Sequence, residues 1–182
     1  ALGISAFIYS AMSFQVALAD DTEIYVPKDL PADQQVRPNI LFVLDSSGSM
    51  GTTVSGTKPK LSRNKVLRNV VNNLIDDLKA KEDTNVGIMR FGTSYDFVQG
   101  GEVNTQGGRI ISAVKRLTVA NADGMKTIVN SVGTDDWTPL SETYYEAYRY
   151  MAGLSPKWGT TSSIAESKSG GKYISPITHS CQ

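Results

Sequence analysis

The chain has 182 residues, a length typical of one domain, and 40% of them are hydrophobic, which is enough to build a core. Lys and Arg number 18, as do Asp and Glu, so the formal net charge is zero and the basic excess typical of nucleic-acid-binding proteins is missing. One cysteine and one histidine exclude a Cys/His zinc site built by this chain alone.

Residues 1–19 have the pattern of a targeting segment. The stretch is apolar and uncharged, and it ends in Ala17-Leu18-Ala19 directly before two aspartates. A short apolar run that ends in a small-x-small triplet is typical of a secretory signal peptide, here a partial one. The alternatives are a membrane anchor or a buried N-terminal helix, for which the run is short. We therefore expect an exported protein with no stable membrane span after signal cleavage.

Residues 20–38 are polar and contain three prolines, at positions 27, 31 and 38. This composition predicts an extended arm or linker. Within it, Glu23–Val26 is compatible with a short edge strand.

Ile40–Leu44 is an unbroken apolar run of strand length. A strand without polar alternation is usually buried on both faces, as in a parallel sheet that is covered by helices. Asp45, Ser47 and Ser49 follow it at once, in a polar segment that contains glycine. Because ligands of open parallel sheets bind just beyond the carboxyl ends of the strands, we expect function at Asp45.

The spacing of Asp45, Ser47 and Ser49 has a chemical interpretation. Alternate residues of an extended backbone point to the same side, so one carboxylate and two hydroxyls would converge. Oxygen ligands suit Mg²⁺, with Ca²⁺ or Mn²⁺ as close alternatives. Because the protein supplies only one negative charge, the cation would still be able to bind a carboxylate from a partner. The competing interpretation is a turn that caps the next helix.

Hydrophobic periodicity predicts the remaining elements. One long helix is expected at Leu61–Leu78, with an apolar stripe of Val66, Leu67, Val70, Val71, Leu74, Ile75 and Leu78 in the core. The other elements expected, in chain order, are a strand at 85–91 parallel to the first, an antiparallel edge strand at 95–98, a loop at 100–108, helices at 109–117, 122–132 and 140–151, and a Ser/Gly/Thr-rich insertion at 157–171.

Thr138-Pro139 introduces the last of these helices. Pro139 suits the first helical position, which makes Thr138 the expected N-cap. The Thr138 hydroxyl would then satisfy a backbone N–H group. Asp135 and Asp136 are expected to be solvated loop acids rather than ligands that act through water.

Two stretches resemble a known family. Ile40-Leu-Phe-Val-Leu-Asp-Ser-Ser-Gly-Ser-Met50 resembles the first strand and metal-ion-dependent adhesion site (MIDAS) of a von Willebrand factor A domain, and Thr138 matches the threonine that this family places on a later loop. The pattern at 138–150 and the closing stretch from Tyr173 are similar to the N-terminal domain of PilC/PilY-type proteins. Proteins of that type are type IV pilus tip adhesins and assembly factors.

The resemblance implies an α/β fold, a Rossmann-like doubly wound sheet of von Willebrand A type, for residues 39–182. The sheet would be incomplete, without its later strands, because the family's Thr-Asp-Gly strand has no counterpart. The resemblance also implies that Asp45, Ser47, Ser49 and Thr138 are the metal ligands. Cys181 would be a lone cysteine in an exported fragment.

The function implied by the resemblance is divalent-metal-dependent cell adhesion in pilus assembly and attachment, without catalysis. The expected location is the periplasm, outer membrane and surface of a Gram-negative bacterium. The expected partners are a host or surface protein that donates a carboxylate, and minor pilins or other pilus machinery. One alternative is a structural A-type domain with an unused metal site. A remote one is an Asp45 phosphohydrolase, which the residues disfavour because Ser47 stands where a second acid is needed.

Overall fold

The computed structural model describes residues 37–56, 58–92, 95–98, 101–104, 107–134, 137–160 and 162–177, and between 95 and 104 only the backbone is described. These residues all belong to one compact unit, Val36–Gln182. The predicted signal peptide and almost all of the predicted linker lie outside the described residues, as do Asp135, Asp136 and Cys181.

A three-stranded mixed sheet forms the centre of this unit, in the order β1-β2-β5. β1 (Asn39–Leu44) pairs in parallel with β2 (Asn85–Gly92), and β2 pairs antiparallel with β5 (Gly107–Arg116). Helix α1 (Arg63–Lys79) connects β1 to β2, as a parallel pair requires. The predicted α/β class and the first parallel strand pair are confirmed.

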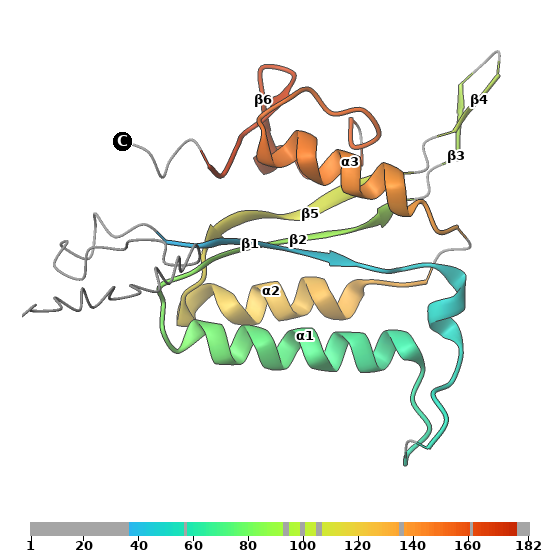
Figure 1. The fold of residues 1–182 in the computed structure, drawn as a ribbon, viewed down its shortest axis with the longest axis vertical. Coiled ribbons are helices and arrows are strands. Elements are labelled where there is room, and N and C mark those ends of the chain that lie inside the picture. The colour runs from blue at the N-terminus through green and yellow to red at the C-terminus, as the bar shows by residue number, and fades with distance from the viewer. Residues whose placement is uncertain are drawn as a thin grey trace, which may run out of the picture. The chain divides into compact units, whose positions relative to one another are not determined.

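Helices cover both faces of the sheet (Figure 1). α1 and α2 (Val119–Ser131) lie on one face, and α3 (Leu140–Met151) lies on the other. Neighbouring residues of β2 pack against different helix layers, since successive side chains of a strand point to opposite faces. Ile88 belongs to the core under α1 and α2, while Met89 belongs to the core under α3, where Tyr150 is also buried.

The segment from 95 to 117 differs from its prediction. The predicted helix at 109–117 is wrong, because β5 is a strand and occupies the edge of β2. Ile110 and Ser112 are buried while Ile111 is half-buried, which is the alternation of a strand. Over so short a segment the β-branched residues fit the periodicity of a helix as well as that of a strand. The segment becomes a strand because it can pair with the edge of β2.

The predicted edge strand at 95–98 exists as β3 (Tyr95–Val98), but it is not part of the central sheet. It pairs with β4 (Gly101–Asn104) in a separate antiparallel hairpin. The expected loop at 100–108 is therefore wrong as well. A second small hairpin, β6 (Lys168–Ser169) with β7 (Lys172–Tyr173), follows the short 3₁₀ helix η2 (Ala165–Ser167).

Helix α1 begins two residues later than predicted because Ser62 caps it. The Ser62 hydroxyl accepts a hydrogen bond from the Lys65 N–H at 3.2 Å. Val71 and Ile75 are buried as expected. Val70 and Leu74, which the pattern also placed in the core, are 50% and 40% exposed, so that part of the prediction is wrong.

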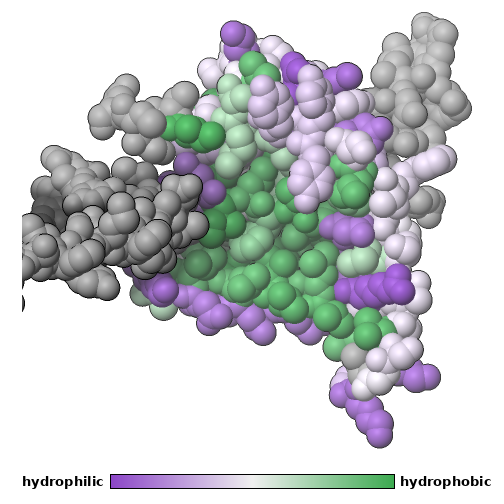
Figure 2. Space-filling view, in the orientation of Figure 1, coloured by the Kyte–Doolittle hydropathy of each residue, from purple (hydrophilic) through white to green (hydrophobic). Residues whose placement is uncertain are grey.

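β1 was predicted to be buried on both faces, and only Leu44 is fully buried. The half-buried state of Ile40–Val43 follows from the position of β1, which lies at an edge of the described sheet. Figure 2 shows a wide hydrophobic area over β1, between α1 and α3. The apolar side chains of β1 thus face the helices on both sides of the sheet. Among the described residues, the outer edge of β1 has no strand partner.

A buried carboxylate fixes the segment after α3. Glu146 has no exposed surface, and its two oxygens accept hydrogen bonds from the backbone N–H groups of Lys157, Trp158 and Gly159 at 3.0–3.1 Å. The Tyr173 hydroxyl donates a fourth hydrogen bond at 2.6 Å. The predicted insertion at 157–171 is therefore tied to α3 at its beginning, and β7 is tied to the same carboxylate.

The Tyr173 hydroxyl makes stability depend on pH. Burial, with the adjacent Glu146 carboxylate, raises the pKa of Tyr173 above its usual value of 10.0. A raised pKa in the folded state means that the contribution to stability is complete below pH 10 and is lost as the pH rises above it. We expect the free energy of unfolding, from urea denaturation between pH 8 and 11, to fall more steeply in the wild type than in Tyr173→Phe. Parallel slopes in the two proteins would contradict this assignment.

Candidate metal-binding loop at the carboxyl end of β1

Three of the four predicted site residues lie together directly after β1. The Ser47 N–H donates to Asp45 Oδ1 at 2.8 Å, and the hydroxyl oxygens of Ser47 and Ser49 are 3.2 Å apart and share a hydrogen bond. Ser47 is buried, Asp45 is half-buried and Ser49 is exposed. These two contacts join Asp45, Ser47 and Ser49, here called the Asp45–Ser49 cluster, in one loop that runs from the buried strand end to the protein surface.

The local backbone explains this arrangement. The loop closes into a short 3₁₀ helix, η1 (Gly48–Gly51), through hydrogen bonds from Met50 N to Ser47 O at 3.0 Å and from Thr52 N to Ser49 O at 3.2 Å. Ser47 precedes η1 in an extended conformation, and its hydroxyl makes no capping hydrogen bond. Asp45 does form the turn of the competing interpretation, because its carboxylate accepts the N–H of Ser47 two residues on, but the loop does not cap α1, which is capped by Ser62.

Ser46 has a different role from its two neighbouring serines. Its side chain has no exposed surface, and its hydroxyl donates to the Phe91 carbonyl at 3.1 Å. This hydrogen bond attaches the loop to the end of β2. Ser46 therefore makes its contact with β2, while Ser47 and Ser49 contact each other.

Thr138 is not brought into this cluster. It is exposed, and the hydrogen bond recorded for it in the described part of the chain joins its carbonyl to the Leu140 N–H at 2.9 Å. The prediction that Thr138 is the N-cap of α3 is also wrong by one residue. Pro139 holds that position, and its carbonyl accepts from the Thr143 N–H at 2.9 Å.

Thr134 is the residue of the same connecting segment that approaches the loop. A Cβ atom built on Gly51 would lie 3.9 Å from Thr134 Oγ1. Sequence reasoning missed this residue, because no motif distinguishes Thr134 from the other polar residues between α2 and α3. Thr134 therefore lies beside η1, while Thr138 makes no hydrogen bond to that loop among the described residues.

Two arginines occupy the same end of the sheet. Arg90 and Arg109 lie opposite each other in the antiparallel ladder, and Arg90 Nε donates to the Phe91 carbonyl at 3.0 Å. Burial, together with the neighbouring Arg109, lowers the pKa of Arg90 to about 10, and burial also lowers the pKa of Arg109. Both guanidinium groups remain charged at neutral pH, and their charge at this end of the sheet would attract an anionic group of a partner and would not help to hold a cation.

The residues of the loop fit a hard cation. One carboxylate and two hydroxyls are oxygen ligands, which Mg²⁺, Ca²⁺ and Mn²⁺ prefer. No group of three or more His, Cys, Asp or Glu side chains forms within the described ranges. Any cation held by this loop would therefore keep most of its positive charge and take its further ligands from water, from other oxygens or from a partner.

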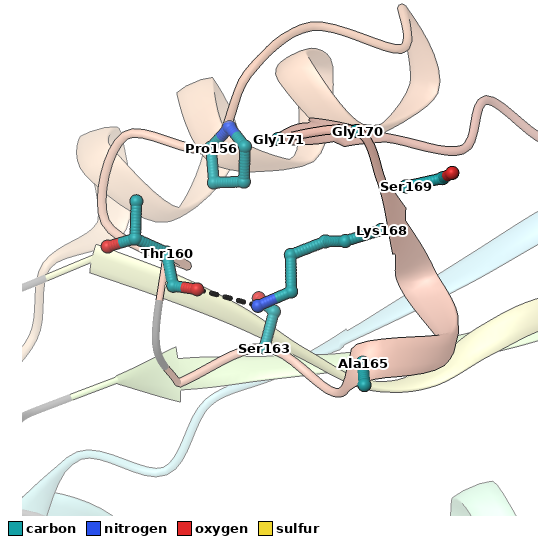
Figure 3. A pocket seen from close by; sticks show the side chains of 8 residues that line it. All are labelled: Pro156, Thr160, Ser163, Ala165, Lys168, Ser169, Gly170 and Gly171. Atoms are coloured by element: carbon teal, nitrogen blue, oxygen red, sulfur yellow. Dashed lines mark hydrogen bonds between the residues drawn. The ribbon is translucent and has the colours of Figure 1, made fainter.

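A separate pocket of about 580 Å³ lies between the segment 156–165 and the β6–β7 hairpin (Figure 3). Its lining is mostly small and polar, and Lys168 is its one charged lining residue. The Lys168 ammonium group donates to the Thr160 carbonyl at 2.6 Å and is 3.5 Å from the Gly159 carbonyl. Because that charge is already engaged by the backbone, the pocket offers no evident recognition group.

No family model and no curated protein matches the chain. Among solved structures, the chain is similar to an uncharacterized membrane-spanning protein of Vibrio fischeri, with 16% identity and a TM-score of 0.46 over 62% of this chain and 48% of that one. It is also similar to a mutant of the PilB minor pilin of Streptococcus sanguinis, with 22% identity and a TM-score of 0.42 over 57% of this chain and 23% of that one. The chain therefore spans about half the length of the first protein and about a quarter of the second.

None of the helices that the structure describes combines the length and hydropathy needed to cross a membrane.

Proposed function

We propose that this chain is a divalent-metal-dependent adhesion module of a type IV pilus-associated surface protein. The proposal is carried by two contacts at the carboxyl end of β1, from the Ser47 N–H to Asp45 Oδ1 and between the hydroxyls of Ser47 and Ser49. These residues would hold Mg²⁺, or Ca²⁺ or Mn²⁺, and Thr138 would join them directly or through water. A cation with so few charged protein ligands supplies an electrophilic position for a carboxylate of the partner protein.

The other parts of the proposal rest on the sequence. The apolar segment at 1–19 supports export, and the pattern at 138–150 supports a role in the pilus. We propose minor pilins or other pilus machinery as assembly partners, and the periplasm, outer membrane and cell surface of a Gram-negative bacterium as the location. The residues support binding rather than catalysis, because Ser47 occupies the position at which an Asp45 phosphohydrolase would need an acid.

We further propose that residues 39–182 are part of a doubly wound sheet of von Willebrand A type. The parallel β1–β2 pair, the helices on both faces and the oxygen cluster at a strand end all support it. The open edge of β1 supports a sheet that continues there. Large apolar side chains are also exposed on the flanking helices α1 and α3, namely Val70, Leu74, Leu140, Tyr144, Tyr145 and Tyr148.

A structural A-type domain that leaves its metal site unused is the second candidate. It is favoured by Thr138, which makes no recorded contact with the serine cluster. The exposed tyrosines of α3 would then serve assembly through protein contacts alone.

Surface attachment of bacteria that carry Asp45→Ala in the complete protein separates these two candidates. We expect attachment in Mg²⁺ to fall to the level of chelator-treated wild-type cells, because the loop loses its one carboxylate, while the amount of protein stays constant. The matched control is Asp123→Ala, which removes an exposed acid of α2. Attachment that is unchanged in Asp45→Ala would reject metal-dependent adhesion and leave the structural role.

A further inference from the structure

Arg63, the first residue of α1, lies beside the oxygen cluster. Its Nη1 group donates to the Ser49 carbonyl at 3.5 Å, and the residue is exposed. Ser49 is also the residue whose hydroxyl contacts Ser47. A guanidinium group therefore borders the exposed side of the candidate metal loop.

The backbone holds Arg63 in this place. The chain leaves η1 at Thr52, and Val54 N bonds to Leu61 O at 2.8 Å. It returns where Arg63 N donates to Thr52 O at 2.9 Å. With the side-chain bond of Arg63 to the Ser49 carbonyl, these two backbone hydrogen bonds tie the start of α1 to the segment that leaves η1. The position of the Arg63 backbone is thus fixed by local hydrogen bonds, while its exposed side chain can adjust to a ligand.

The Arg63 guanidinium has unused hydrogen-bonding capacity. It forms no ion pair with any acid in the described part of the chain, and it uses one of its five N–H donors, in the long bond to Ser49. Two parallel N–H groups match the two oxygens of a carboxylate. A carboxylate that binds the cation through one oxygen can accept a hydrogen bond from the Arg63 guanidinium with its other oxygen.

We propose that Arg63 is a specificity-determining residue that binds the carboxylate of the partner. This inference rests on the proposed function of the loop. Arg63 selects an acidic side chain over a neutral oxygen ligand such as an amide or a hydroxyl. It binds the partner and is not a ligand of the cation, so its removal does not weaken metal binding.

The test uses the full chain with Mn²⁺ as the metal and acetate as the probe. Water-proton relaxation reports bound Mn²⁺ and falls when acetate displaces coordinated water. We expect Arg63→Ala to weaken acetate binding about 10-fold, which is the loss of one charge-assisted hydrogen bond, and Arg63→Lys to retain part of it. Lys65→Ala, which removes a neighbouring exposed cation of α1, is the matched control and should bind acetate as the wild type does.

The outcomes separate this inference from the function on which it rests. If the wild type binds no Mn²⁺, the proposed function fails. If Mn²⁺ binds equally to both proteins and acetate binds Arg63→Ala as tightly as the wild type, Arg63 has no such role while the metal site stands. Loss of Mn²⁺ binding in Arg63→Ala would also overturn the inference, since Arg63 would then support the loop itself.

Discussion

Replacement of Glu146 by glutamine is expected to lower the free energy of unfolding by about 3 kcal/mol. The Glu146 carboxylate is completely buried and accepts hydrogen bonds from three backbone N–H groups and from the Tyr173 hydroxyl. Glutamine has the same shape but turns an NH₂ group toward some of these donors, which are then buried without acceptors. Urea denaturation at pH 7 measures the effect.

Two further variants make this prediction specific. Gly159→Ala keeps the carboxylate but places a Cβ atom against the Tyr173 hydroxyl and Ser163 Oγ, so we expect a loss of comparable size. Glu142→Gln changes an acid one turn earlier on α3 that is only half-buried, and it should alter stability by less than about 0.5 kcal/mol. A Glu146→Gln protein as stable as the wild type would show that the 157–159 segment is held in some other way.

Asp45→Asn is expected to weaken Mn²⁺ binding by about 100-fold, or about 2.7 kcal/mol. The change keeps the size of the side chain and an oxygen that can accept the Ser47 N–H, so the loop should keep its shape. What is lost is the single negative charge of the Asp45, Ser47 and Ser49 cluster. Isothermal titration calorimetry of the full chain with Mn²⁺ measures the affinity.

Ser46→Ala is the matched control for this loop. The Ser46 hydroxyl donates to the Phe91 carbonyl and not to Ser47 or Ser49. We therefore expect Ser46→Ala to lower the free energy of unfolding by about 1 kcal/mol and to leave the Mn²⁺ affinity unchanged. Equal affinities of the wild type and Asp45→Asn would remove Asp45 from the metal site.

The features that were predictable from the sequence are those with local causes. β1 follows from an unbroken apolar run, and Ser47 and Ser49 make the contact that the sequence predicts directly after it. α3 follows from its helical periodicity after Thr138-Pro139. In each case a short stretch of chain contains both the signal and the structure that it specifies.

The features that were missed depend on residues far apart in the chain. β5 is a strand because it completes the edge of β2, and an apolar pattern of ten residues does not contain that information. Glu146 has the sequence context of a surface acid in a helix rich in tyrosine. Its burial is satisfied by backbone N–H groups of 157–159, which no side-chain pattern reveals.

The position of the segment between α2 and α3 is a third case. Thr138 matches a motif, whereas Thr134 matches none and is nevertheless the residue near Gly51. The hydrogen bonds of Leu140 and Thr143 to Thr138 and Pro139 set the start of α3, and they leave Thr138 exposed. A motif gives the residue type at a position, while the helix start determines where its side chain lies.

Paramagnetic broadening by Mn²⁺ in amide NMR spectra tests the central proposal most directly. With substoichiometric Mn²⁺, we expect the amide signals of Ser46–Thr52 to disappear first, followed by that of Thr134. The amides of Thr84 and Asn85 lie at the opposite end of β2, about 20 Å away along the strand, and should remain sharp. Uniform broadening of all amides, or broadening centred elsewhere in the chain, would show that the loop after β1 does not bind the cation.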